Sequence, residues 1–182
     1  MSVEFQPVKV PLPDRGLVFR SLETADLEAL GAFHAGLSPR TREFWHRQAD
    51  ARTLAAEHCD AIDRFDKLRL VADDGRMIVA VFELSFSIPD GDHQRFAAYG
   101  LRLDEKTDAR IGPCVRDDDQ GSGLAPRLLA ETARIARREG RSRLILWGGV
   151  QHENHRARRF YEREGFSEVG RSDSIIDMVR PI

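Results

Sequence analysis

The sequence is poor in cysteine and has no long apolar run. Only Cys59 and Cys114 are present among its 182 residues, and we interpret both as the reduced thiols of a cytosolic protein. A single domain of this length can bury about 70% of its unfolded surface, so it needs no disulfide. The longest strongly apolar stretch, residues 78–82, is far shorter than the ~20 residues that span a bilayer. These absences predict one cytoplasmic domain over residues 1–182, without a transmembrane helix.

The beginning of the chain also lacks a targeting pattern. Residues 1–14 have no basic end followed by an apolar run, so they do not resemble a secretory signal. We expect residues 1–16 to be an N-terminal extension of the domain. The net charge is −2, which argues against the broad basic surface of nonspecific nucleic-acid-binding proteins. Neither a nucleic acid nor a membrane is therefore expected as a partner.

Residue patterns along the chain predict an α/β fold of the α+β type. Apolar residues at helical spacing, preceded by capping residues, predict about four helices. Stretches rich in β-branched and aromatic residues predict a mixed, largely antiparallel central sheet of about six to seven strands. The segment 87–94, with Pro89 and Gly91, is expected to be a loop. The expected helices cover 24–35, 41–62, 124–139 and 154–164, and the expected strands cover 17–20, 67–72, 77–86, 96–103, 109–116 and 144–150, with a final pair within 169–179.

A glycine-rich segment, VRDDDQGSGLAP at residues 115–126, lies between an expected strand and an expected helix. This arrangement is typical of anion sites, because the N–H groups of the helix's first turn point at the ligand with the positive end of the helix dipole behind them. The segment has no Lys-Ser or Lys-Thr pair after its last glycine, as a P-loop requires, and Pro126 stands where a Rossmann loop needs Gly or Ala. The segment therefore indicates a pyrophosphate site of another kind.

The same segment resembles the motif of the GNAT superfamily, the acyl-CoA-dependent N-acetyltransferases. That motif has Arg or Gln, two residues, Gly, one residue, and then Gly or Ala, as in residues 120–125. The resemblance covers residues 68–182 well, and it implies a single GNAT-like domain. In that fold, the strand containing Cys114 and the strand at 144–150 would splay apart and hold acyl-CoA. A second match starts 34 residues after Gln120 and follows the family's pattern near the domain end, with Asn154, Ala157, Tyr161, Gly165 and Phe166.

The resemblance also implies the cofactor contacts. Asn154 would touch the pantetheine arm of acetyl-CoA from the side opposite the strand that contains Cys114. Arg127 is expected either to make a charge-assisted contact to a phosphate or to lie in solvent. Backbone groups flanking the pantetheine arm would come from Cys114, Val115 and Arg116, and those holding the pyrophosphate from Gln120, Gly121, Ser122, Gly123, Leu124 and Ala125.

Acyl transfer to an amine needs a neutral amine and stabilisation of the departing thiolate. Tyr161 matches the tyrosine that family members often use as general acid toward the CoA sulfur, and a place in the apolar core is its alternative role. Many members have a glutamate base ten residues before the position of Gln120, where this sequence has Arg110. The base is left open between Glu83, Glu105 and a water chain.

The resemblance thus predicts an N-acetyltransferase that transfers the acetyl group of acetyl-CoA to a primary amine of a small molecule or protein. The alternative is a non-catalytic acyl-CoA-binding regulatory module. Members of the family are often dimers, so a homodimer is one expected assembly. No metal is expected, because His152 and His155 alone are too few for a zinc site. Two charged clusters remain. The first is expected to consist of loop carboxylates bonded to local amides, and its members are Asp117, Asp118 and Asp119. The second is expected to be either a solvated helix face or a contact to the 3′-phosphate of CoA, and its members are Arg156, Arg158, Arg159 and Arg163.

Overall fold

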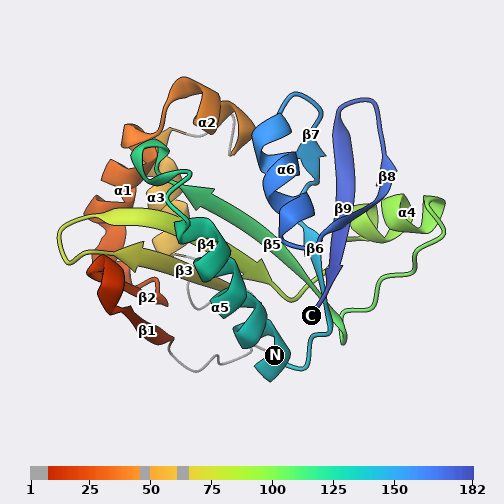
Figure 1. Cartoon of the computed structure of the whole chain (residues 1–182), viewed down its shortest axis with the longest axis horizontal. Helices are drawn as coiled ribbons and strands as arrows, with labels where there is room; N and C mark the ends of the chain where they lie inside the picture. Colours follow the sequence, from red (N-terminus) through yellow and green to blue (C-terminus); the bar gives the residue numbers. More distant parts are fainter. Residues whose placement is uncertain (1–7, 46–49, 61–65) are drawn as a thin grey trace. The chain divides into compact units, whose positions relative to one another are not determined.

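The computed structural model describes residues 8–45, 50–60 and 66–182. The described residues form nine strands, six α-helices and three short 3-10 helices (Figure 1). The predicted α/β class is confirmed, with mixed and mostly antiparallel strand pairing, although it has more strands and helices than expected. The prediction of a single domain stays a prediction. Contacts group the chain into unit 1, Met1–Glu83 with Pro113–Leu128, and unit 2, Leu84–Gly112 with Leu129–Ile182.

Unit 1 begins with a hairpin inside the expected N-terminal extension. β1 (Lys9–Leu12) pairs antiparallel with β2 (Leu17–Ser21), and β2 pairs antiparallel with β3 (Lys67–Asp73). The turn between β1 and β2 is the 3-10 helix η1 (Pro13–Arg15), which ends at Gly16 with φ of 62°. Residues 9–15 are therefore part of the sheet and its turn.

The next strands continue the order β3-β4-β5. β4 (Ile78–Ser85) is buried along its whole length, including its polar residues Glu83 and Ser85. β5 (Asp108–Val115) precedes the glycine-rich segment. β4 and β5 each have residues in both units.

The expected helix at 41–62 is wrong as a single element, because the chain forms two shorter helices there. After η2 (Thr24–Asp26) and α1 (Leu27–Gly36), α2 covers Pro39–Phe44 and α3 covers Ala51–Asp60. Ser38 caps α2 through a hydrogen bond from the Thr41 N–H to its hydroxyl (3.2 Å), and Trp45 ends this helix in an extended conformation. Residues 46–49 and 61–62 of the expected helix lie outside the described residues.

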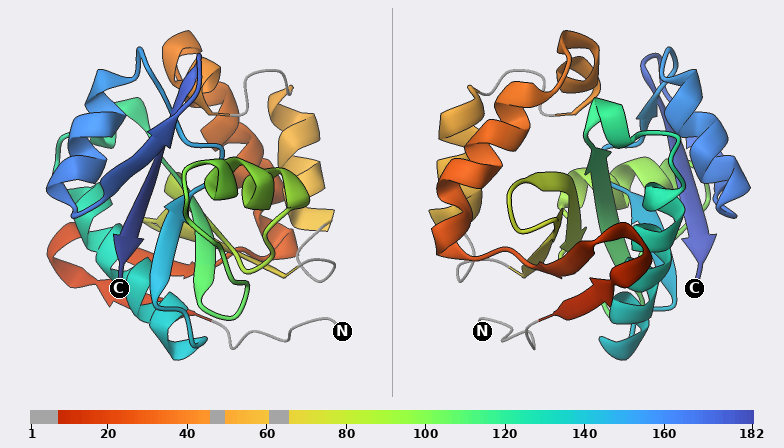
Figure 2. Two further views of the ribbon diagram at one scale, coloured as in Figure 1. Left: turned by 90° about the vertical axis from the view of Figure 1, so that its right-hand side faces the viewer. Right: turned by 60° about the vertical axis from the view of Figure 1, so that its left-hand side comes forward.

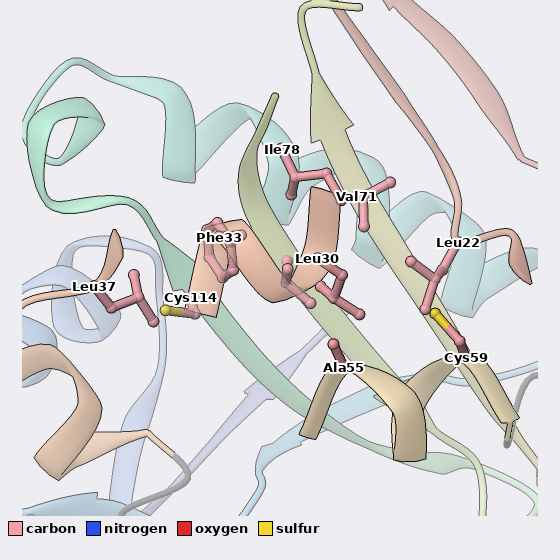
Figure 3. Packing of buried hydrophobic residues seen from close by; sticks show 10 residues of the cluster. Leu22, Leu30, Phe33, Leu37, Ala55, Cys59, Val71, Ile78 and Cys114 are labelled. Atoms are coloured by element: carbon pink, nitrogen blue, oxygen red, sulfur yellow. The ribbon is translucent and has the colours of Figure 1, made fainter. Parts of the chain in front are cut away.

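The core of unit 1 lies between these helices and the strands (Figure 3). α1 and α3 pack against each other and against one face of β3, β4 and β5. Burial of such side chains contributes roughly 25 cal/mol per Å² of apolar surface. The cluster consists of Leu22, Leu30, Phe33, Leu37, Ala55, Cys59, Val71, Ile78, Val81 and Cys114.

Unit 2 orders its strands β4-β5-β6-β9-β7, with β8 paired to β9 (Figure 2). β5 and β6 (Arg143–Leu146) are parallel, and their register runs from Asp108 opposite Arg143 to Ile111 opposite Leu146. The expected strand at 144–150 is instead β6 and the short β7 (Val150–Gln151), because Gly148 and Gly149 take φ of 71° and 68° between them. The expected final pair is the antiparallel hairpin β8 (Ser167–Arg171) and β9 (Ile175–Pro181).

The strand expected at 96–103 is wrong. Residues 96–98 are the end of α4 (Asp90–Ala98), and residues 99–103 follow it without forming a strand. The same helix replaces part of the expected loop at 87–94. Asp90 and Asp92 lie in its first turn, where negative charge suits the dipole, and Gly100 follows it at φ of 79°. Phe96 packs with Ile145 and Val179 in the core of unit 2.

Two more helices complete the fold of the described residues. α5 (Leu124–Arg138) and α6 (His155–Arg163) form where predicted. Within residues 8–45, 50–60 and 66–182, no helix is both long and apolar enough to cross a membrane.

Candidate functional site

The glycine-rich segment of unit 1 forms a tight loop between β5 and α5. After β5, residues 117–119 form the 3-10 helix η3. Gly121 and Gly123 follow with φ of 79° and 80°, a conformation that costs a residue with a Cβ about 1–2 kcal/mol. Gln120 closes the loop, because its Nε2 donates to the Val115 carbonyl oxygen at 2.8 Å. The loop therefore requires glycine at two positions for conformational reasons.

Asp117 joins this loop to the start of α2. Its carboxylate accepts hydrogen bonds from the Ser38 N–H (2.9 Å), the Ser38 hydroxyl (2.8 Å) and the Thr41 hydroxyl (2.6 Å). Burial raises the pKa of Asp117, but the hydrogen bonds from Ser38 and Thr41 outweigh it, so the pKa lies below its ordinary value. Asp117 is thus an ionised anchor of the loop.

The other two carboxylates of η3 differ from each other. Asp119 accepts from Arg116 Nε at 2.7 Å, and its backbone carbonyl accepts from the Ser122 hydroxyl at 2.6 Å. Asp118 is exposed. The expected bonding to local amides is therefore not what these contacts show, since Asp117 binds the distant Ser38 amide and two hydroxyl groups and Asp119 binds a guanidinium.

The first turn of α5 completes the loop. Leu124 is buried and anchors this turn, whereas Gly121, Ser122 and Gly123 are exposed. The first N–H groups of a helix have no carbonyl partner within it, so the N–H groups of Leu124 and Ala125 are available to a ligand. This is the geometry that an anion such as a diphosphate requires.

Two residues of η1 contact this part of unit 1. Asp14 accepts from Arg127 Nη1 through both carboxylate oxygens. Arg15 donates through Nη2 to the Ser122 carbonyl oxygen. The sequence does not predict this contact of Arg15, because no local pattern in residues 1–16 relates them to a loop more than a hundred positions away.

The end of β5 contributes Cys114 and Val115, which are both buried. Burial raises the pKa of the Cys114 thiol, which therefore stays protonated and does not act as a nucleophile. Arg116 donates its backbone N–H to the Val79 carbonyl oxygen at 2.9 Å. The expected loop residues, from Cys114 to Arg127, thus lie together in unit 1.

Asn154 and Tyr161 belong to unit 2, where both lie on or next to α6. Asn154 is the predicted N-cap, and its Oδ1 accepts from the Ala157 N–H at 3.2 Å. Tyr161 is 8% exposed, and its ring centre lies 5.2 Å from those of Phe160 and Phe166. The aromatic ring is therefore packed in place from two sides.

Arg110, where many family members have a glutamate, is buried in unit 2. Its Nε donates to the Ser87 carbonyl oxygen (2.9 Å), Nη2 donates to the Ser85 hydroxyl (3.2 Å), and Nη1 pairs with Asp92 (3.3 Å). Asp92 also pairs with Arg95 at 2.8 Å. Asp92 therefore forms ion pairs with two guanidinium groups.

The two carboxylates considered as bases are also engaged. Glu83 is buried and pairs with Arg69 (3.0 Å) and His58 (3.7 Å). Glu105 accepts from the Ile88 N–H at 2.8 Å. These contacts give both carboxylates structural roles.

Of the arginines on α6, Arg158 pairs with Glu162 at 2.9 Å and lies 3.7 Å from Glu168. A shallow hollow on this helix is lined by His155, Arg158, Arg159 and Glu162. Within the described ranges, no group of three or more His, Cys, Asp or Glu side chains is placed to hold a metal ion.

The model of the acetyltransferase (GNAT) family matches residues 36–166, which include the loop, Asn154 and Tyr161. The chain belongs to the GNAT acetyltransferase family. It is therefore an acyltransferase by family, and the resemblance seen in its two motifs is confirmed. No curated protein sequence matches it.

Solved structures of GNAT proteins share the fold. The GNAT domain of S. lividans PAT superposes with a TM-score of 0.76 and 22% identity, over 98% of this chain and all of that domain. Aminoglycoside acetyltransferase AAC(6′)-Ib in complex with coenzyme A has a TM-score of 0.71 and 16% identity, over 91% and 94% of the two chains. Ribosomal-protein-S5-alanine acetyltransferase from Vibrio fischeri has a TM-score of 0.69 and 10% identity, over 96% of each chain.

Proposed function

We propose that this GNAT protein transfers the acetyl group of acetyl-CoA to a primary amine. The observation that carries the proposal is the loop of unit 1, in which Gly121 and Gly123 take φ near 80° directly before the free N–H groups of α5. Such a loop lets a diphosphate approach the backbone closely. The solved AAC(6′)-Ib complex with coenzyme A supports the same choice of ligand for a protein of this fold.

Each group of the loop has a role in this proposal. The N–H groups of Leu124 and Ala125 bind the diphosphate of acetyl-CoA, and the ionised Asp117 fixes the loop through Ser38 and Thr41. Gln120 holds the end of β5 against the loop. A bound diphosphate therefore meets donors that are already in position, which lowers the ordering cost of binding.

Tyr161 acts on the leaving thiolate. Complete proton transfer from a phenol with a pKa near ~10 to a thiolate whose thiol has a pKa near ~8.5 would cost about 2 kcal/mol. Tyr161 therefore donates a hydrogen bond that strengthens as negative charge develops on sulfur, which is the way that preformed donors stabilise transition states.

The proton of the amine passes to water in this proposal. Arg110 cannot accept a proton, and Asp92, Glu83 and Glu105 are engaged by the groups described above. An acceptor with a pKa near ~10.4 would be almost entirely protonated at neutral pH. Transfer should therefore become faster as the pH rises toward the pKa of the amine.

The test is transfer to a panel of amines with acetyl-CoA as donor. The panel contains polyamines, aminoglycosides, peptides with an internal lysine, and peptides with only a free N-terminal amine. An acetylated product detected by mass spectrometry, with stoichiometric release of CoA, supports the proposal.

Arg110 favours a second function, because it occupies the position of the family's glutamate and an arginine cannot act as a general base. This function is that of a non-catalytic acyl-CoA-binding regulatory module. It predicts binding of acetyl-CoA without transfer to any amine of the panel, which is the outcome that would contradict the catalytic proposal.

A further inference from the structure

The turn η1 reaches the glycine loop from a part of the sequence that the family motifs do not include. Arg15 donates to the Ser122 carbonyl oxygen, and a Cβ placed on Gly123 would lie 3.3 Å from Arg15 Nη2. The neighbouring Asp14 pairs with Arg127. Two consecutive residues of η1 thus contact the loop and the first turn of α5, all within unit 1.

Arg15 and Arg127 differ in the charge of the groups that they contact. The guanidinium of Arg127 is compensated by Asp14, which binds it through both oxygens. Asp117 is occupied by Ser38 and Thr41, and Asp119 is occupied by Arg116. Arg15 is exposed, and its contact at the loop is a neutral carbonyl. Arg15 therefore brings a positive charge next to Gly123, where its hydrogen-bond partner is a neutral carbonyl and not a carboxylate.

An arginine in this place can exchange partners without a large movement. The contact of Arg15 with the Ser122 carbonyl oxygen has an ionised donor only, whereas a contact with a phosphate would also have an ionised acceptor and could be bidentate, which makes it stronger. The Gly16 turn after Arg15, with φ of 62°, fixes where η1 ends, while the exposed side chain is able to rotate. A diphosphate on the loop would thus be the preferred partner of Arg15.

We propose that Arg15 is a diphosphate-binding residue, so that the anion site of this protein consists of the loop and the turn of the N-terminal hairpin. This inference rests on the proposed function, since it assigns a further ligand to the same diphosphate. Arg127 then has a positioning role, because its pairing with Asp14 holds η1 beside α5. The turn η1, which lies within the expected extension, is then a functional part of the site.

The test is calorimetric binding of CoA and of 3′-dephospho-CoA to the wild type and to Arg15→Ala. The two ligands share the diphosphate and differ in the 3′-phosphate. We expect Arg15→Ala to weaken binding of both ligands about tenfold or more, the usual effect of losing one charge-assisted contact. Arg15→Lys should recover part of the affinity, because it keeps the charge and loses the planar guanidinium.

The matched control is Lys9→Ala, which removes one exposed positive charge from the far end of β1 in the same hairpin. We expect its affinity for both ligands, and the melting temperature of both alanine variants, to equal those of the wild type. Equal affinities of wild type and Arg15→Ala would overturn the inference. So would a loss seen with CoA alone, since it would place Arg15 at the 3′-phosphate. If the wild type binds neither ligand, the proposed function itself fails.

Discussion

The guanidinium of Arg110 lies over the ring of Trp147, with Cζ 4.4 Å from the ring centre. Its nitrogens bond at the same time to Ser85, Ser87 and Asp92. A residue that is tied in this way to a strand, a loop and a helix of unit 2 has a structural role. The protein therefore uses for structure a position at which many members of the family have a catalytic base.

Replacing Arg110 with methionine should remove the polar contacts and keep apolar contact with Trp147. We expect Arg110→Met to lower the free energy of unfolding by about 2–4 kcal/mol, because buried polar partners lose their donors. Chemical denaturation measures this change. Arg134→Met is the control, since Arg134 is half-exposed and pairs with Glu131 on the same helix, and it should change stability by less than about 0.5 kcal/mol. Equal effects of the two substitutions would contradict a structural role for Arg110.

Gly123 and Gly140 form a matched pair for testing the loop. Their φ angles are 80° and 78°, so alanine should cost each about 1–2 kcal/mol of stability. A Cβ on Gly123 would meet Arg15, whereas a Cβ on Gly140 would have nothing within 4 Å. We expect only Gly123→Ala to weaken acetyl-CoA binding, which a titration of both variants measures. If both variants or neither lose affinity, the loop is not the diphosphate site.

Asp117→Asn tests the anchor between the loop and α2. At neutral pH we expect a loss of about 1–3 kcal/mol, because the carboxylate accepts three hydrogen bonds. The pKa of Asp117 is lowered in the folded protein, so its charge stabilises the fold above the unfolded pKa near ~3.9. The difference between wild type and variant should therefore shrink as the pH falls below that value. Asp118→Asn, at an exposed position, should show no such pH-dependent difference.

The two tyrosines of the chain allow a comparison of catalytic and structural hydroxyl groups. Tyr161→Phe keeps the packing against Phe160 and Phe166, and we expect kcat on an accepted amine to fall at least about tenfold. Tyr99→Phe removes a hydrogen bond of 3.2 Å to the buried Asp177. It should lower the melting temperature and leave kcat near that of the wild type. An unchanged kcat for Tyr161→Phe would show that the role assigned to Tyr161 is wrong.

The sequence predicts best those features that depend on residues close together in the chain. The loop at Gly121 and Gly123, the N-cap at Asn154 and the helix α5 depend on local geometry, and the structure contains all of them where expected. The residues of α4 were divided between a loop at 87–94 and a strand at 96–103, because Pro89 and Gly91 are typical of a loop and the residues near Phe96 also suit a sheet. The signals for a helix were present as acidic residues in its first turn and a glycine just after its end.

Contacts between residues far apart in the chain could not be predicted from the sequence. Nothing near Arg15 indicates a contact with Ser122, and nothing near Ser38 indicates that it binds Asp117. Both contacts follow from how β1, β2 and α2 pack in unit 1, which depends on tertiary structure. The partners of Arg110 were inaccessible for the same reason, because they come from β4, the segment after it and α4.

The central claim is that the loop of this GNAT protein binds acetyl-CoA. It is tested most directly by calorimetric and thermal-shift titration of the purified protein with acetyl-CoA, CoA and NADH. We predict that acetyl-CoA and CoA bind and that NADH does not. A ligand at 100 times its Kd adds about 2.7 kcal/mol of stability, which raises the melting temperature by several degrees. Absence of binding by both acetyl-CoA and CoA would contradict the account.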